Sequence, residues 1–150
     1  MRFIDMHCHP PVRDFLDGTF GRFLPELERR FGRSVARMSP DELADYYRSL
    51  DGRAVILGWD NEATTGLPPF SSQHVAKLVA TAPDVFIGFG AVDPHRTDLI
   101  GPVEEIAELG LPGIKFHPSA QGFDPSRKRY RPMFELAAEL GLVCLFHTGY

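Results

Sequence analysis

The stretch Ile4–Pro10, IDMHCHP, decides the fold class, because an apolar run ends there in two histidines separated by one residue. Similar runs recur along the chain, and the last two also end in histidine: GIKFHP over 113–118 and LVCLFHTG over 142–149. Short runs dense in Ile, Val, Leu and Phe are typical of strands buried on both faces of a parallel sheet. We therefore predict strands at Arg2–His9, Arg53–Asp60, Val85–Asp93, Gly113–His117 and Leu142–His147.

The segments between these runs have the periodicity of helices. They lie at Ser39–Leu50, Phe70–Pro83, Arg96–Gly110 and Tyr130–Gly141. Ser39, followed by Pro40 and Glu42, has the pattern of a capped helix start, and Gly110 and Gly141 mark helix ends. This alternation is typical of an α/β protein, either an open doubly wound sheet or a (β/α)8 TIM barrel of which these are the first five β-strands. The absence of a Gly-rich loop after the first strand disfavours a nucleotide-binding sheet.

The composition is that of a single globular domain. The 150 residues are 43% hydrophobic and 24% charged, with a formal net charge of -4, which excludes a disordered chain and disfavours non-specific binding to nucleic acid. The two cysteines, Cys8 and Cys144, are too few for a disulfide framework, and we expect both to be reduced. The first residues are unlike a signal peptide, and no apolar run has bilayer length. We therefore expect a cytoplasmic protein without nucleic-acid or membrane partners.

One connection stands out by its length. The segment Pro10–Arg37 is longer than an ordinary link between a strand and a helix, and FLPELERRFG inside it, residues 23–32, has helical character. We predict that residues 1–150 form the N-terminal portion of one barrel, with a lid-like insertion at about 10–37 over the strand ends.

The first strand ends in a candidate metal pair. His7 and His9 are two residues apart, so a strand points both imidazoles to one face, with Cys8 on the other. Two converging imidazoles suit a divalent metal such as zinc, although an isolated H-x-H is also common in surface turns. Regular alternation places Asp5 on the histidine face, where its carboxylate could accept a hydrogen bond from a ligand imidazole and so fix its tautomer, or could simply be solvated.

Two further histidines end later strands. His117 shares a face with Lys115, and His147 is in phase with Val143 and Leu145. A lone histidine is ordinarily structural, but a barrel builds its active site where the carboxyl ends of its strands meet, so the coincidence favours one shared site for a small-molecule substrate. Trp59 could form a pocket wall or pack in the core. Arg13 could neutralise a substrate carboxylate or be solvated.

With these motifs assembled, the sequence resembles the amidohydrolase superfamily, in the amidohydrolase-related branch that includes the aminocarboxymuconate-semialdehyde and resorcylate-type decarboxylases. IDMHCHP, GIKFHP and LFHTG carry the resemblance, in the family's order over the whole chain. It implies that His7, His9 and His147 are metal ligands, that Asp5 is the acid of the D-x-H-x-H pattern, and that His117 lines the site beside the substrate. In other branches the lysine at the position of Lys115 is carboxylated and bridges two metals, which makes Lys115 a less favoured ligand here.

The resemblance also implies a function. Members are complete eight-stranded barrels whose histidine acid/base and last metal-binding aspartate come from strands 6 and 8, which lie outside these 150 residues. We expect a metal-dependent hydrolase or non-oxidative decarboxylase acting on a small carboxylated or amide-like substrate, with this activity belonging to the whole barrel. The alternatives are a TatD-like metal-dependent nuclease, which would need a glutamate on the fourth strand, and a non-catalytic metal-binding fragment. The open edges of the first and fifth strands would favour association of the fragment, including a homo-oligomer.

Overall fold

The computed structural model describes residues 1–148 and contains a parallel five-stranded sheet in which each strand pairs with the next one in the sequence. The strands are β1 (Phe3–Cys8), β2 (Gly52–Leu57), β3 (Phe86–Ala91), β4 (Gly113–Phe116) and β5 (Val143–Phe146). A doubly wound sheet reverses its strand order at a switch point, whereas a barrel adds strands in sequence. The order β1-β2-β3-β4-β5 therefore confirms the first five strands of a barrel and excludes the doubly wound alternative.

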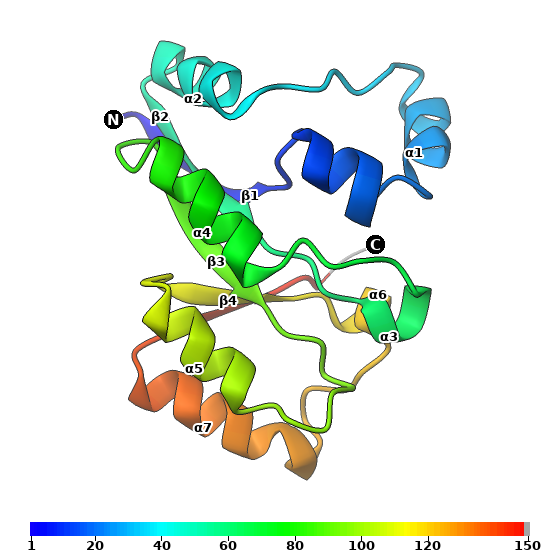
Figure 1. Cartoon of the computed structure of the whole chain (residues 1–150), viewed down its shortest axis with the longest axis vertical. Helices are drawn as coiled ribbons and strands as arrows, with labels where there is room; N and C mark the ends of the chain where they lie inside the picture. The colour runs from blue at the N-terminus through cyan, green and yellow to red at the C-terminus, as the bar shows by residue number, and fades with distance from the viewer. Residues whose placement is uncertain (149–150) are drawn as a thin grey trace.

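Four helices follow the strands on the outside of the curled sheet, and all four were predicted. They are α2 (Pro40–Ser49), α4 (Ser72–Thr81), α5 (Gly101–Glu108) and α7 (Arg131–Glu139). Figure 1 shows these helices stacked along one side of the sheet, each against its neighbouring strands. α5 begins later than predicted because the Asp98 carboxylate accepts hydrogen bonds from the Ile100 and Gly101 amides, which holds the preceding residues in a turn.

The shorter elements lie in the connections. Helix α1 (Leu24–Phe31) confirms the helix predicted inside the long insertion, and the π-helix η1 (Asp14–Thr19) precedes it. The one-turn helices α3 (Glu62–Thr65) and α6 (Pro118–Gln121) and the 3-10 turn η2 (Lys128–Tyr130) were not predicted. Figure 1 shows α3 and α6 side by side, beyond the ends of β2 and β4.

Strand alternation divides the apolar residues into two groups. Ala54, Ile56 and their counterparts on the other strands pack against the helices and form the helix-side core, whereas Val55, Leu57 and Phe89 form a smaller interior cluster on the concave face. Gly90 on β3 faces the helices, where an added Cβ would come within 2.7 Å of side-chain atoms of α4 and α5. The glycine therefore allows both helices to approach the sheet closely.

The two outer strands depart from the predicted burial. Phe3, Ile4 and Met6 on β1 are 40%, 39% and 46% exposed, and Val143 on β5 is 54% exposed. Because β1 and β5 are the edges of this sheet, each has a neighbouring strand on one side only. The prediction of burial on both faces is thus wrong for these strands and right for the inner ones. Within residues 1–148, no helix combines the length and apolar character needed to cross a bilayer.

Candidate active site at the carboxyl ends of the strands

An irregularity in β1 determines which side chains reach the concave face. Asp5 pairs with Ala54 and Cys8 pairs with Ile56, so three steps along β1 match two steps along β2. This extra residue is a β-bulge, which changes the phase of a strand. Because paired residues share a face, Asp5 and Cys8 both lie on the side of the helix-side core, while His7 reaches the concave face.

The predicted position of Asp5 is therefore wrong. Its carboxylate accepts a hydrogen bond from the Tyr47 hydroxyl of α2 at 2.7 Å and another from the backbone N–H of His7 at 2.9 Å. Asp5 thus holds the main chain before the first histidine and does not contact an imidazole nitrogen in this structure. Cys8, as predicted, faces the helix layer, and burial raises the pKa of its thiol to about 11.

His7 and His9 converge as the sequence predicted. Their Nε2 atoms are 3.2 Å apart, and their rings meet edge to face with centroids separated by 5.0 Å. The buried Nδ1 atom of His9 has no hydrogen-bond partner among the described residues. Two imidazoles each about 2.0–2.1 Å from one zinc ion place their nitrogens about 2.8–3.4 Å apart at angles of about 90–109°. The pair therefore has the spacing that a shared divalent ion requires.

The strands β4 and β5 bring the other two predicted histidines to the same place. His147 lies edge-on to His7 with ring centroids 5.5 Å apart, and its ring stacks on His117 at 3.9 Å. We call His7, His9, His117 and His147 the imidazole cluster. Lys115 lies on the same face of β4 as His117 and is only 3% exposed. All four sequence-predicted histidines are thus neighbours.

Burial lowers the pKa of several basic groups in and beside the imidazole cluster. Burial, and next the neighbouring His7, lowers the pKa of His9 to about 3. Burial and the nearby His147 lower the pKa of His117 to about 4, and burial, followed by the positive charge of Lys115, lowers the pKa of His7. The pKa of Lys115 is also lowered by burial. Neutral imidazoles have the free lone pair that a metal ligand needs.

The cap of α6 determines which ring nitrogen of His117 carries the proton. His117 precedes α6, and its Nδ1 atom accepts a hydrogen bond from the Ala120 amide at 3.3 Å, with the Ser119 hydroxyl at 3.2 Å. A neutral imidazole carries one proton, so Nδ1 as acceptor leaves that proton on Nε2. His117 is therefore a hydrogen-bond donor at Nε2.

Aromatic side chains form one wall of the cluster. Trp59 meets His9 and His117 edge to face, with centroid distances of 5.1 and 5.2 Å. Phe15, from the insertion, stacks on the His9 ring with a centroid distance of 5.5 Å. The indole N–H of Trp59 is buried and has no acceptor among the described residues. Trp59 lines a small pocket and also packs against the helix-side core, so the structure does not separate its two interpretations. The contribution of Phe15 was not predicted because no local pattern marks it.

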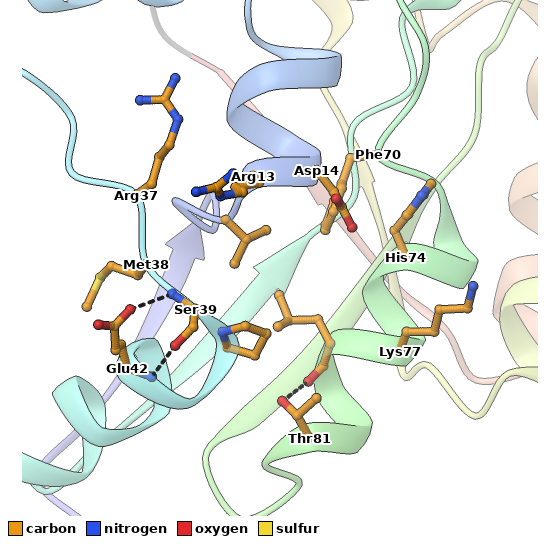
Figure 2. Close-up of a pocket in the computed structure, with 13 residues that line it drawn as sticks. Arg13, Asp14, Arg37, Met38, Ser39, Glu42, Phe70, His74, Lys77 and Thr81 are labelled. Carbon is orange, nitrogen blue, oxygen red and sulfur yellow. Dashed lines mark hydrogen bonds between the residues drawn. The ribbon is translucent and has the colours of Figure 1, made fainter.

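The structure places Arg13 elsewhere. It lines a cavity of about 560 Å³ between α2 and α4 on the outside of the sheet, and none of the imidazole cluster lines that cavity. Figure 2 shows Arg13 and Arg37 on one side of it and His74 and Lys77 on α4. The His74 ring accepts a hydrogen bond from the Ser71 amide and so takes part in the cap of α4.

The described residues form only part of a metal site. The pair His7 and His9 fits a divalent ion by the spacing of its nitrogens, but within residues 1–148 no three His, Cys, Asp or Glu side chains are grouped closely enough to enclose one. His147 stands next to the pair with its ring stacked on His117. The third ligand predicted from the sequence is thus a neighbour of the pair.

The chain is similar to known proteins along most of its length. The profile of the amidohydrolase family matches residues 4–150. A 2-amino-3-carboxymuconate-6-semialdehyde decarboxylase from Dictyostelium discoideum is 25% identical over 150 residues, an alignment that covers 96% of this chain and 41% of that protein. These findings favour the amidohydrolase hypothesis over the nuclease and the non-catalytic fragment.

Solved structures share the fold. An uncharacterized TIM-barrel protein from Bordetella bronchiseptica superimposes with a TM-score of 0.72 at 18% identity, covering 98% of this chain and 55% of that one. A probable 2-pyrone-4,6-dicarboxylic acid hydrolase from Acinetobacter baumannii, with citric acid bound, gives 0.64 at 14% identity, covering 99% and 50%.

This chain spans about half the length of these barrels and less than half of the decarboxylase. The family profile nevertheless matches nearly all of it, and the predicted motifs meet at one site of a partial barrel. The chain belongs to the amidohydrolase family.

Proposed function

We propose that this chain supplies the metal-binding part of an amidohydrolase-family enzyme that acts on a small carboxylated substrate, by hydrolysis or by non-oxidative decarboxylation. The separation of 3.2 Å between Nε2 of His7 and Nε2 of His9 carries the proposal, because that spacing suits one shared divalent ion. His147 would be the third ligand. Zinc is the first choice of metal, since imidazole nitrogens suit this borderline ion and three protein ligands leave a position open for substrate.

A bound divalent ion would supply Lewis-acid polarisation of a substrate oxygen. The chain itself offers three nitrogen donors near that position: the Lys115 ammonium, the Nε2–H of His117 and the indole N–H of Trp59. All three side chains line one small pocket. The buried indole N–H of Trp59 has no acceptor among the described residues, so an anionic oxygen would satisfy a donor that is otherwise left unpaired.

This donor set supports a carboxylated substrate. A carboxylate oxygen held by Lys115 and His117 would be fixed beside the histidine pair, with its reacting carbon oriented by the remaining contacts. The names of the decarboxylase and of the probable dicarboxylic acid hydrolase also describe carboxylated molecules as substrates of those proteins. Phe15 and Trp59 would exclude water from the His9 side, which gives the predicted lid-like insertion its function.

Metal analysis tests the proposal directly. The purified chain, supplied with zinc and then desalted, should retain about one ion per chain, and the double variant His7→Ala/His9→Ala should retain none. His74→Gln is the matched control, because it changes a histidine on an outer helix and leaves the imidazole cluster intact. Cobalt substitution adds a spectroscopic readout of the coordination. Equal metal content in the wild type and the double variant would refute the proposal.

A further inference from the structure

The side chain of Gln121 joins the ends of three strands beneath the imidazole cluster. Its Nε2 donates to the backbone carbonyl of Asp60, after β2, at 2.7 Å, and to that of Val92, after β3, at 2.9 Å. Its Oε1 accepts a hydrogen bond from the backbone N–H of His117, after β4, at 2.9 Å. Both amide hydrogens and the amide oxygen are thus used, and the residue is only 3% exposed.

We propose that Gln121 is a positioning residue that holds His117 in the orientation with Nε2–H toward the substrate. The inference rests on the proposed function in one respect, namely that His117 contacts substrate. The backbone N–H of Gln121 also donates to the His117 carbonyl at 2.8 Å, so His117 is held at both its amide and its carbonyl. With the main chain fixed in this way, the ring caps α6 through Nδ1 and presents its proton at Nε2.

The short helix α6 cannot supply this order alone. It has one turn, Pro118–Gln121, and a single turn is not stable by itself because nucleation costs more than its hydrogen bonds return. Gln121 anchors this turn to carbonyls that are 61 and 29 residues away in the sequence. Removing the amide would leave buried backbone groups of Asp60, Val92 and His117 without a partner, and the turn would be free to move with the ring that it caps.

A second contact strengthens the anchor. The Nε2 atom of His95 lies 2.6 Å from the Gln121 carbonyl oxygen, and the carboxylate of Asp93 accepts the His95 amide at 2.9 Å. The loop after β3 therefore holds the main chain of Gln121 while the Gln121 side chain holds the loops after β2 and β4.

The test compares Gln121→Met with Gln73→Met, which makes the same substitution at an exposed position of α4. Two NMR readouts on the metal-free chain are used: hydrogen exchange of the His117 amide, and the ¹⁵N shifts of the imidazole rings, which report the tautomer. The wild type should show a protected His117 amide and Nε2–H on its ring. In Gln121→Met, exchange should be at least about tenfold faster, because the His117 amide loses its hydrogen bond to the Gln121 side chain, and the ring should be a mixture of tautomers. Gln73→Met should match the wild type.

A third variant covers the case in which Gln121→Met does not fold. Gln121→Glu keeps an oxygen for the His117 amide and loses both donors, so the loops after β2 and β3 should loosen while the His117 amide stays partly protected. An Nδ1–H tautomer of His117 in the wild type would overturn the inference, and so would an unchanged ring in a folded Gln121→Met. Neither readout depends on metal or substrate, so failure of the metal-binding test and failure of this test can be told apart.

Discussion

Removal of the Tyr47 hydroxyl group tests whether the β1 bulge turns Asp5 toward α2. The Tyr47 hydroxyl donates to the Asp5 carboxylate at 2.7 Å and lies beside the Cys8 thiol in the helix-side core. Tyr47 is 6% exposed, so Tyr47→Phe leaves the ring packed and removes only the hydroxyl, with its hydrogen bond to Asp5 and its contact with Cys8. Because this bond ties α2 to the strand that carries the two histidines, its loss should destabilise the fold at the site.

The magnitude follows from the partners. A hydrogen bond to a charged acceptor contributes about 1.5–3 kcal/mol to the free energy of unfolding. In the variant, the Asp5 carboxylate still accepts a hydrogen bond from the His7 amide and is partly open to water. We therefore expect a loss of unfolding free energy at the lower end of this range, about 1.5 kcal/mol. For a chain of this length, that loss lowers the melting temperature by about 3–6 °C.

Thermal and urea unfolding followed by circular dichroism measure this loss. Tyr46→Phe is the matched control, since Tyr46 precedes Tyr47 on α2, is 52% exposed, and its hydroxyl makes no hydrogen bond with residues 1–148. A double-mutant cycle with Asp5→Asn should give a coupling of about 1 kcal/mol between the two side chains. Equal stability of the two tyrosine variants, or a coupling near zero, would show that Asp5 does not face α2.

Two further predictions concern the helix-side core. With a pKa of about 11, the Cys8 thiol should be ionised in about one molecule in a thousand at pH 8. Labelling of Cys8 by a thiol reagent should therefore be slow and should accelerate about tenfold per pH unit, while the half-buried Cys144 reacts faster. Rapid labelling of Cys8 would contradict its burial. Met133→Ala should lower the free energy of unfolding, measured in urea, by about 2–5 kcal/mol, because Met133 is fully buried on α7. Leu140→Ala should lower it by less than about 1 kcal/mol, because Leu140 is 44% exposed. Similar losses in the two variants would refute the packing of α7 described above.

The sequence by itself determined the order of the elements and the phase of the later strands. Alternation along GIKF places Lys115 on the concave face and Ile114 against the helices, and the structure agrees. The same reasoning brought His117 and His147 to the end of the barrel that His7 shares. These predictions succeed because side-chain direction in a regular strand depends only on local spacing.

Only the tertiary structure decided the positions of Asp5, Arg13 and Gln121. The bulge that turns Asp5 toward Tyr47 arises from pairing between β1 and β2, and no residue within β1 marks it. The hydrogen bonds of Gln121 reach carbonyls far along the chain, and Arg13 follows the path of a long insertion. Period-two alternation is a local property, whereas bulges, loop paths and buried polar contacts depend on which distant segments meet, and that is determined when the whole sheet and its helices pack together.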